Sequence, residues 1–157
     1  LKIEDAVNAT KAAIAEGIVA GGGSALLKVS RKLEVKYKDS AEAKTVAENV
    51  RSAEYAAGYL SIVEALREPI RQIAINAGKD AGVVLADVLK GGANSGYDAL
   101  NDIFVSDMFV AGIIDPVKVE RSALENAASA VAVLLTTEVA ITDEPKKEEK
   151  VQPGIDY

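Results

Sequence analysis

The sequence contains no cysteine, no histidine and no tryptophan in its 157 residues. Without cysteine and histidine, the chain cannot form disulfides, thiolate nucleophiles, zinc sites of the Cys/His type or a Ser-His-Asp triad. Carboxylates, lysines, hydroxyls and backbone groups remain available for chemistry. A metal held by such ligands would be a hard cation such as Mg²⁺.

Aromatic residues are also scarce, at 4% of a chain that is 49% hydrophobic. The length suits one domain with a real core, and abundant alanine and valine predict closely packed helices. The formal net charge is −6, which argues against a nucleic-acid partner. No apolar run is long enough to span a membrane, and the first residues do not resemble a signal peptide, so we expect no membrane partner. The chain begins at Leu1, within a helical pattern, and we expect it to be a piece of a longer protein.

Apolar residues recur at helical spacing along most of the chain and predict an all-α fold, mainly a helical bundle with one or two short strands. Pro69 lies inside one such pattern and predicts a kink or a new helix start. Asp115, before Pro116, predicts an N-cap followed by a helix. The other expected helices cover residues 4–16, 24–36, 41–57 and 83–89, with a further turn or two at 105–111.

The segments between these helices carry their own predictions. Residues 36–39 are expected to form a turn, and Gly58 to break or bend its helix. Tyr97 is expected to enter a short strand, and residues 139–142 to form an edge strand. The last helix, over residues 119–134, is expected to have one packed face. Residues 143–157 form a charged tail that contains prolines, and we expect this tail to be disordered.

A triple glycine, Gly21-Gly22-Gly23, interrupts the helical sequence. Each glycine costs a helix about 1 kcal/mol relative to alanine. One interpretation is a structural turn between helices. The other is an anion site, because bare N–H groups and the dipole of the next helix both favour negative charge. Nucleotide fingerprints such as Gly-x-x-x-x-Gly-Lys-Ser/Thr are absent, so the motif alone leaves both interpretations open.

Six strings occur in the same order as in group I chaperonins of the GroEL type, and the sequence resembles that family over about residues 1–145. The resemblance indicates the last helix of the intermediate domain and the second half of the equatorial domain. The strings are Glu4-Asp5-Ala6, Glu16-Gly17-Ile18-Val19-Ala20-Gly21-Gly22-Gly23, Pro69-Ile70-Arg71-Gln72-Ile73, Gly96-Tyr97-Asp98-Ala99, Gly112-Ile113-Ile114-Asp115-Pro116 and Thr136-Thr137-Glu138.

The resemblance implies roles for six residues in ATP binding and hydrolysis. Asp5 matches the aspartate that moves over the nucleotide and helps to position the attacking water. A carboxylate suits that task, because phosphoryl transfer depends mainly on positioning and charge neutralisation. Asp115 matches the acid that binds the ribose hydroxyls. The remaining matches are a backbone contact at Gly22 and the adenine loop at Asp98, Ala99 and Leu100.

Each of these residues also has a purely structural interpretation. Asp5 lies in the first turn of a predicted helix, where the dipole favours an acid. Asp115 reads as an ordinary N-cap. Tyr97 is more typical of a half-buried strand than of a platform for a base. In place of the asparagine of many relatives, this sequence has Asp98, which puts a negative charge near the base.

The resemblance also implies the organisation of the whole protein. Residues 1–16 would be an intermediate-domain helix, residues 17–142 half of the equatorial domain, and residues 143–157 a tail. The full subunit would be an ATPase that uses ATP and Mg²⁺ and forms a homo-oligomeric double ring with a co-chaperonin and unfolded client proteins. The metal ligands and the phosphate-binding loop would lie in a preceding part of the subunit. We therefore expect the 157 residues alone to be inactive and to self-associate.

The location implied by the resemblance is the cytoplasm, with an organelle matrix as the alternative. The competing function is a self-standing helical module that binds another protein and has no nucleotide chemistry. A carboxylate-based metal enzyme is a third, weaker reading, because Glu-x-x-His pairs need histidine. The placement of Gly22, Asp98 and Asp115 discriminates between the first two. Convergence on one face would favour the chaperonin, and scatter would favour the module.

Overall fold

The computed structural model describes residues 2–38 and 50–142. Residues 41–49 of one expected helix and the expected tail, 143–157, lie outside the described residues. By its contacts the chain divides into two compact units, Leu1–Ser122 and Ala123–Tyr157.

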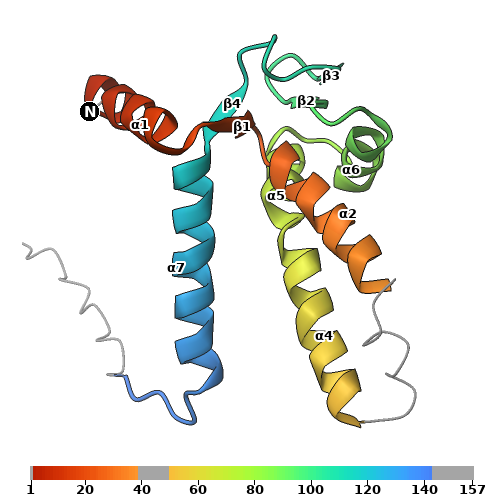
Figure 1. The fold of residues 1–157 in the computed structure, drawn as a ribbon, viewed down its shortest axis with the longest axis vertical. Coiled ribbons are helices and arrows are strands. Elements are labelled where there is room, and N and C mark those ends of the chain that lie inside the picture. The colour runs from red at the N-terminus through yellow and green to blue at the C-terminus, as the bar shows by residue number, and fades with distance from the viewer. Residues whose placement is uncertain (1, 39–49, 143–157) are drawn as a thin grey trace, which may run out of the picture. The chain divides into compact units, whose positions relative to one another are not determined.

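The described residues are mainly helical, with two pairs of short strands, which confirms the predicted fold class (Figure 1). The elements in chain order are α1 (Lys2–Glu16), β1 (Ile18–Ala20), α2 (Ser24–Lys38), α4 (Val50–Ala65), α5 (Glu68–Asn76), α6 (Ala81–Lys90), β2 (Gly96–Asp98), β3 (Ile103–Val105), β4 (Ile114–Pro116) and α7 (Val117–Leu135). No helix among the described residues has both the length and the apolar character needed to cross a membrane.

The helix ends follow the local sequence in most places. Pro69 lies in the first turn of α5, so the predicted new helix start is confirmed. α6 begins after Asp80, whose Oδ1 accepts the N–H of Val83 at 3.1 Å. The predicted break at Gly58 is wrong: α4 continues through it, since one glycine costs only about 1 kcal/mol. The predicted turn at 36–39 is wrong at its start, because α2 continues to Lys38.

The strands form two separate antiparallel pairs. β1 pairs with β4, with Val19 opposite Asp115, and β2 pairs with β3, with Tyr97 opposite Phe104. The strand at Tyr97 is confirmed, whereas β1, β3 and β4 were not predicted. Of the helical turns expected at 105–111, one is present, closed by the bond from the Ala111 N–H to the Asp107 carbonyl at 3.1 Å, and β3 extends to residue 105 before it. In that turn Asp107 Oδ1 accepts the N–H groups of the two residues that lie two and three positions further on.

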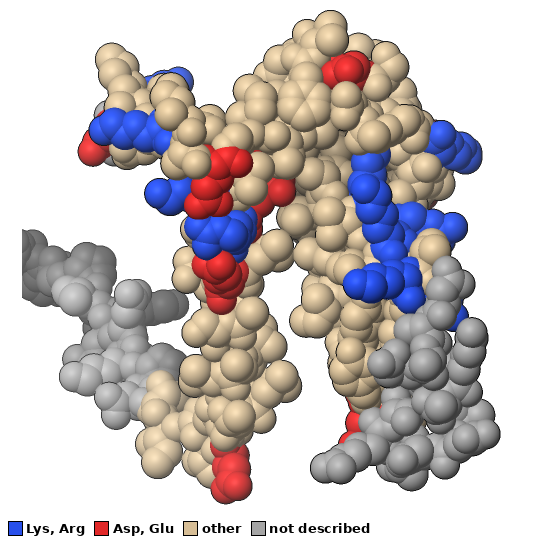
Figure 2. Space-filling view, viewed as in Figure 1, with Lys and Arg blue, Asp and Glu red and all other residues tan. Residues whose placement is uncertain are grey.

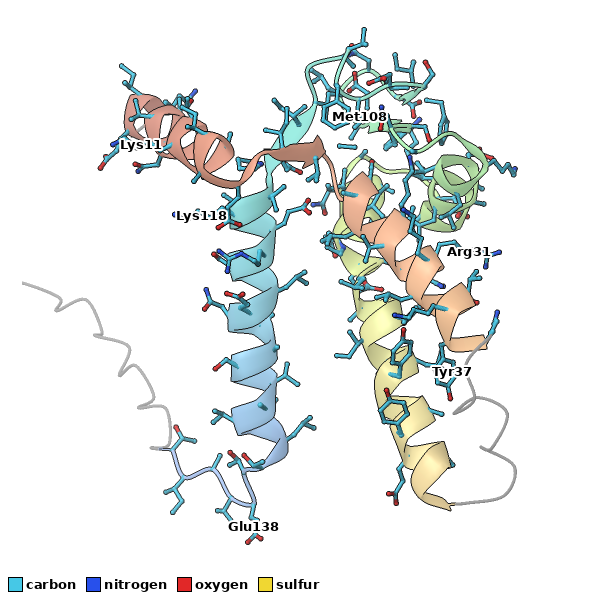
Figure 3. The ribbon with its side chains drawn as sticks, viewed as in Figure 1. Lys11, Arg31, Tyr37, Met108, Lys118 and Glu138 are labelled. Carbon is cyan, nitrogen blue, oxygen red and sulfur yellow. The ribbon has the colours of Figure 1, made fainter. Side chains whose placement is uncertain are left out.

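The core joins α2, α5, α6 and β2, which lie side by side in Figure 1. Its largest fully buried members include Leu27 of α2 and Ile70 of α5. Tyr97 of β2 closes this cluster and is 5% exposed. Further out, the Tyr37 and Tyr59 rings stack with centroids 4.9 Å apart and hold α2 against α4; Figure 3 labels Tyr37. The other members of the core are Ala74, Val84, Leu85 and Val88.

α7 has no buried residue, so the packed face predicted over 119–134 is wrong in this chain. The predicted edge strand at 139–142 is also wrong, because the structure forms neither a strand nor a helix over these residues. Large apolar side chains from Val131 to Ile141 are exposed, with Ile141 at 96%, as expected for an apolar surface without a partner. Within the second unit, α7 therefore presents apolar side chains to solvent.

Candidate functional site

The triple glycine lies in the turn between β1 and α2, directly beside β4. The N–H of Gly22 donates a hydrogen bond to Oδ2 of Asp115 at 3.0 Å. The N–H of Gly21 donates to the carbonyl of Ile113 at 3.0 Å. The triple glycine therefore forms a tight turn, and one of its N–H groups binds the carboxylate of Asp115.

Gly22 and Gly23 both have left-handed backbones, with φ of +64° and +72°. A Cβ on Gly23 would lie 2.7 Å from the backbone nitrogen of Ile70, so the turn packs directly on the first turns of α5. A Cβ on Gly22 would meet only the Tyr97 carbonyl oxygen at 3.7 Å and the Met108 Cε at 3.8 Å. Met108 is labelled in Figure 3. Gly22 therefore faces the strand that carries Asp98.

Asp115 does not cap α7, so the predicted N-cap is wrong. It lies in β4 opposite Val19, and α7 begins two residues later at Val117. Strand pairing keeps its backbone extended, and the carboxylate reaches the Gly22 N–H instead of the helix. One carboxylate oxygen, Oδ2, makes that bond. The geometry therefore brings Asp115 and Gly22 together across the sequence.

Asp98 shapes its own loop. Its Oδ1 accepts the N–H groups of Leu100 at 2.9 Å and Asn101 at 3.1 Å, and its Oδ2 accepts the Asn101 side-chain amide at 2.7 Å. The amide contact is the main reason that the pKa of Asp98 lies below its usual value. The two carboxylate oxygens therefore hold the backbone of Leu100 and Asn101 in the hairpin turn.

The two residues that follow Asp98 point in different directions. Ala99 is partly buried and packs against the core, whereas Leu100 is 92% exposed at the hairpin tip. Behind the tip, Asp102 has a left-handed backbone and accepts hydrogen bonds from Lys79 and from the Tyr97 hydroxyl. The β2–β3 hairpin, which carries the predicted adenine contacts, is therefore held to the rest of the unit by the hydrogen bonds of Asp102.

Asp5 does not join the other predicted residues. It is exposed in the first turn of α1, eleven positions before Glu16, the last residue of that helix. At 1.5 Å per residue, that places it about 16 Å along the helix axis from Glu16. Among the described residues, no hydrogen bond or ion pair connects Asp5 with Gly22, Asp98 or Asp115. At the far end of α1, Glu16 forms a bidentate ion pair with Arg121 of α7 at 2.6 and 3.0 Å.

Glu120 was not among the predicted residues, although it lies one turn into α7 from Asp115. It is half-buried, and burial raises the pKa of its carboxyl, with the charge of Asp115 as the smaller cause. A glutamate at the start of a helix looks like an ordinary dipole partner, so the sequence alone gives no reason to select it. In the structure, Glu120 is therefore a second acidic side chain near Asp115, the residue predicted to bind the ribose.

Lys28 was also not predicted, and it contacts the glycine-rich loop before β2. Figure 2 shows basic side chains along this part of the molecule, and the basic residues in the sequence of α2 are Lys28, Arg31, Lys32, Lys36 and Lys38. Lys28 differs from the others because its ammonium is partly buried among carbonyl oxygens, and burial lowers its pKa. In the part of the chain that the structure describes, no three acidic side chains group closely enough to hold a metal ion.

A comparison with protein families matches residues 1–145 to the TCP-1/cpn60 chaperonin family. The chain belongs to the TCP-1/cpn60 chaperonin family. Among solved structures, the chain is similar to the open-state monomer of a group II chaperonin from Methanococcoides burtonii, with 23% identity and a TM-score of 0.60. The match covers 76% of this chain and 28% of the other, so this chain spans little more than a quarter of that chaperonin.

The family match and the structural likeness support different parts of the prediction made from the sequence. The family match confirms that the resemblance to chaperonins is correct. The structural likeness confirms the fold, and the solved structure to which this chain is similar is a group II chaperonin and not a group I chaperonin. Membership of the chaperonin family is therefore established for this chain.

Proposed function

We propose that this chain forms one wall of the ATP pocket in a group I chaperonin subunit that assists protein folding. The hydrogen bond between Gly22 and Asp115, with the Tyr97 carbonyl beside Gly22, is the observation that carries the proposal. It brings together three segments that are distant in sequence and that carry the residues matched to the nucleotide contacts. The long strings shared with GroEL-type proteins support the group I assignment.

Each predicted residue has a definite task in this proposal. Asp115 accepts the ribose hydroxyls through the oxygen that Gly22 does not use. The loop at Asp98, Ala99 and Leu100 contacts the adenine, and the Asp98 carboxylate holds that loop in shape through its bonds to Leu100 and Asn101. Asp5 orients the attacking water. Because α1 holds Asp5 away from the other residues, this role requires α1 to move when the nucleotide binds.

The proposal assigns Mg²⁺ and the phosphate-binding loop to residues outside this sequence. Bound Mg²⁺ would neutralise charge on the phosphates during transfer. Residues 1–16 belong to the intermediate domain in this scheme, and residues 17–142 to the equatorial domain. The full protein would form a homo-oligomeric double ring in the cytoplasm and would bind a co-chaperonin and client proteins through other domains. The 157 residues alone would not hydrolyse ATP.

The test uses the complete subunit that carries these residues. Asp5→Ala should lower kcat by about 100-fold or more, as expected for loss of the group that positions the water, with ATP affinity unchanged. Asp115→Ala should weaken ATP binding about tenfold, because hydrogen bonds to the ribose are lost. An exposed acid on the same helix as Asp5 provides the control, Glu4→Ala, which should alter neither value.

Two results would contradict the proposal. Absence of ATP binding by the complete subunit would remove the nucleotide role and favour a helical module that binds another protein. Substantial hydrolysis by the 157 residues alone would show that the phosphate chemistry does not lie elsewhere. The group I assignment is tested separately: assembled rings should bind a separate co-chaperonin in the presence of MgATP, and failure to do so would favour group II.

A further inference from the structure

We propose that Lys28 is a positioning residue that sets the distance between the Gly22 turn and the hairpin at Asp98. This inference deepens the proposed function and rests on it. Lys28 lies on the second turn of α2, whose first turn follows the triple glycine. Its ammonium binds the loop that leads into β2, so one side chain connects the two segments that would line opposite sides of a bound nucleoside.

The Lys28 ammonium contacts four oxygen atoms of one short loop. Nζ lies 2.5 Å from the Gly92 carbonyl oxygen, 2.8 Å from that of Ala93 and 2.6 Å from that of Ser95. The Ser95 hydroxyl is fourth, at 3.0 Å. An ammonium has three N–H donors, so the three carbonyl oxygens can take all of them. None of the four acceptors carries a formal charge, so Lys28 acts as a cation that organises a loop and not as half of an ion pair.

The same loop is fixed on its other side by uncharged contacts. The Met108 N–H donates to the Asn94 carbonyl at 2.9 Å. The Ser95 hydroxyl lies 2.9 Å from the Gly92 carbonyl oxygen and 3.3 Å from that of Val88. A Cβ on Gly96 would lie 2.5 Å from Ser24 Oγ and 2.6 Å from Met108 Sδ. The start of β2 is therefore pressed against the first residue of α2, and Lys28, one turn later, holds the preceding loop against the same helix.

This arrangement predicts an effect on the base side of the pocket and not on the phosphates. Without the ammonium, the Ala93 and Ser95 carbonyl oxygens lose the donor that they share, while the Gly92 carbonyl keeps the Ser95 N–H at 3.1 Å. The loss of this shared donor should loosen the loop. The movement would pass to β2 and to Asp98. Nucleotide affinity and discrimination between bases should fall, while the reaction at the phosphates, once ATP is bound, should proceed as before.

The first experiment examines the loop itself and needs no nucleotide. Hydrogen exchange is measured on the full 157-residue chain with Lys28→Ala, and with Lys32→Ala as the control, because Lys32 is an exposed lysine on the same helix. Lys28→Ala should speed exchange of the Gly96 and Met108 amides about tenfold or more. Propylammonium ions should restore part of that protection, and the control should match wild type. Unchanged exchange in Lys28→Ala would overturn the inference.

The second experiment uses the complete subunit. Lys28→Met should raise the KM for ATP about tenfold, leave kcat at saturation within about twofold, and lower the preference for ATP over GTP. Should Lys28→Met fail to fold, Lys28→Gln, which keeps two N–H donors, takes its place with a smaller increase. A fall in kcat with KM unchanged would overturn the positioning role. If wild type itself binds no nucleotide, the proposed function fails, whereas the exchange experiment still decides the role of Lys28 in the loop.

Discussion

The N–H of Gly22 binds Oδ2 of Asp115 at 3.0 Å, although 93 positions separate the two residues. The bond closes the short β1–β4 pair, in which Val19 lies opposite Asp115. The same turn packs on α5 through Gly23. The two neighbouring glycines thus have different roles: Gly22 binds a carboxylate, and Gly23 allows the turn to pack closely on the backbone of α5.

Alanine substitutions should separate these two tasks. Both positions have left-handed backbones, where a side chain costs about 1–2 kcal/mol. At Gly22 the added methyl group has ordinary contacts only, so Gly22→Ala should lower the free energy of unfolding by about that amount. Gly23→Ala adds a 2.7 Å clash with the Ile70 nitrogen and should cost about 3 kcal/mol or more. Urea denaturation measures both values, and equal losses would contradict this assignment of tasks.

The half-buried Glu120 should make stability depend on pH in a definite direction. Burial, and to a lesser degree the charge of Asp115, raise its pKa above the ordinary value of 4.5. Its contribution is therefore fully present below pH 4.5 and is lost as the pH rises through the raised pKa. Glu120→Gln should match wild type at pH 4 and melt about 1–2 °C higher at pH 7. A gain at pH 4 as large as the gain at pH 7 would rule out titration of Glu120 as the cause.

The helices could be predicted from the sequence because their signals are local. Pro69 marks the start of α5, and the apolar spacing marks α2 and α6, within one or two turns of chain. β1 and β4 contain three residues each and pair across the length of the unit, so neither has a local pattern. Asp115 shows the consequence: its local sequence predicts a cap, while the distant partner Val19 places it in a strand.

Some residues of the candidate site could likewise be predicted from the sequence, and others could not. Family resemblance supplied Gly22 and Asp115, and the structure brings them together. Lys28 could not be found from the sequence, because its partners are backbone carbonyls 64 to 67 positions away, and any residue type can supply a carbonyl. Asp98 was selected as a ligand residue, whereas its carboxylate holds its own loop, a local contact typical of aspartate in turns.

An ion pair between Glu34 and Arg67 should stabilise the contact between α2 and the start of α5. Their charged atoms are 2.7 Å apart, and both side chains are at most 23% exposed. A double-mutant cycle with Glu34→Gln and Arg67→Met should show a coupling energy of about 1 kcal/mol. Arg31 provides the matched control, because its charged atom lies 3.4 Å from Glu34 and its side chain is 56% exposed. The coupling energy between Arg31 and Glu34 should therefore be less than about 0.5 kcal/mol.

The pKa of Glu34 supplies the pH dependence of that coupling. The hydrogen bond from Lys38 is the main cause that holds this pKa below 4.5, and the nearby arginines contribute less. The stabilising contribution is thus present above pH 4.5 and is lost as the pH falls through the lowered pKa. The Glu34–Arg67 coupling should be lost in strong acid and constant from pH 6 to pH 8. Coupling that persists after Glu34 is protonated would show that packing, and not charge, joins the two helices.

The uncovered apolar side chains at the end of α7 should make this chain self-associate. Leu134 and Leu135 are 71% and 80% exposed, and Val139 and Ile141 follow them at 73% and 96%. Contiguous apolar surface of this kind promotes association, since its burial stabilises by about 25 cal/mol per Å². Sedimentation velocity should show dimers or larger species whose proportion rises with concentration. The double variant Leu134→Gln, Leu135→Gln should shift the distribution toward monomer, whereas Ser129→Gln, an exposed change on the same helix, should not. A monomer over a wide concentration range in the unaltered chain would show that this surface does not bind another copy.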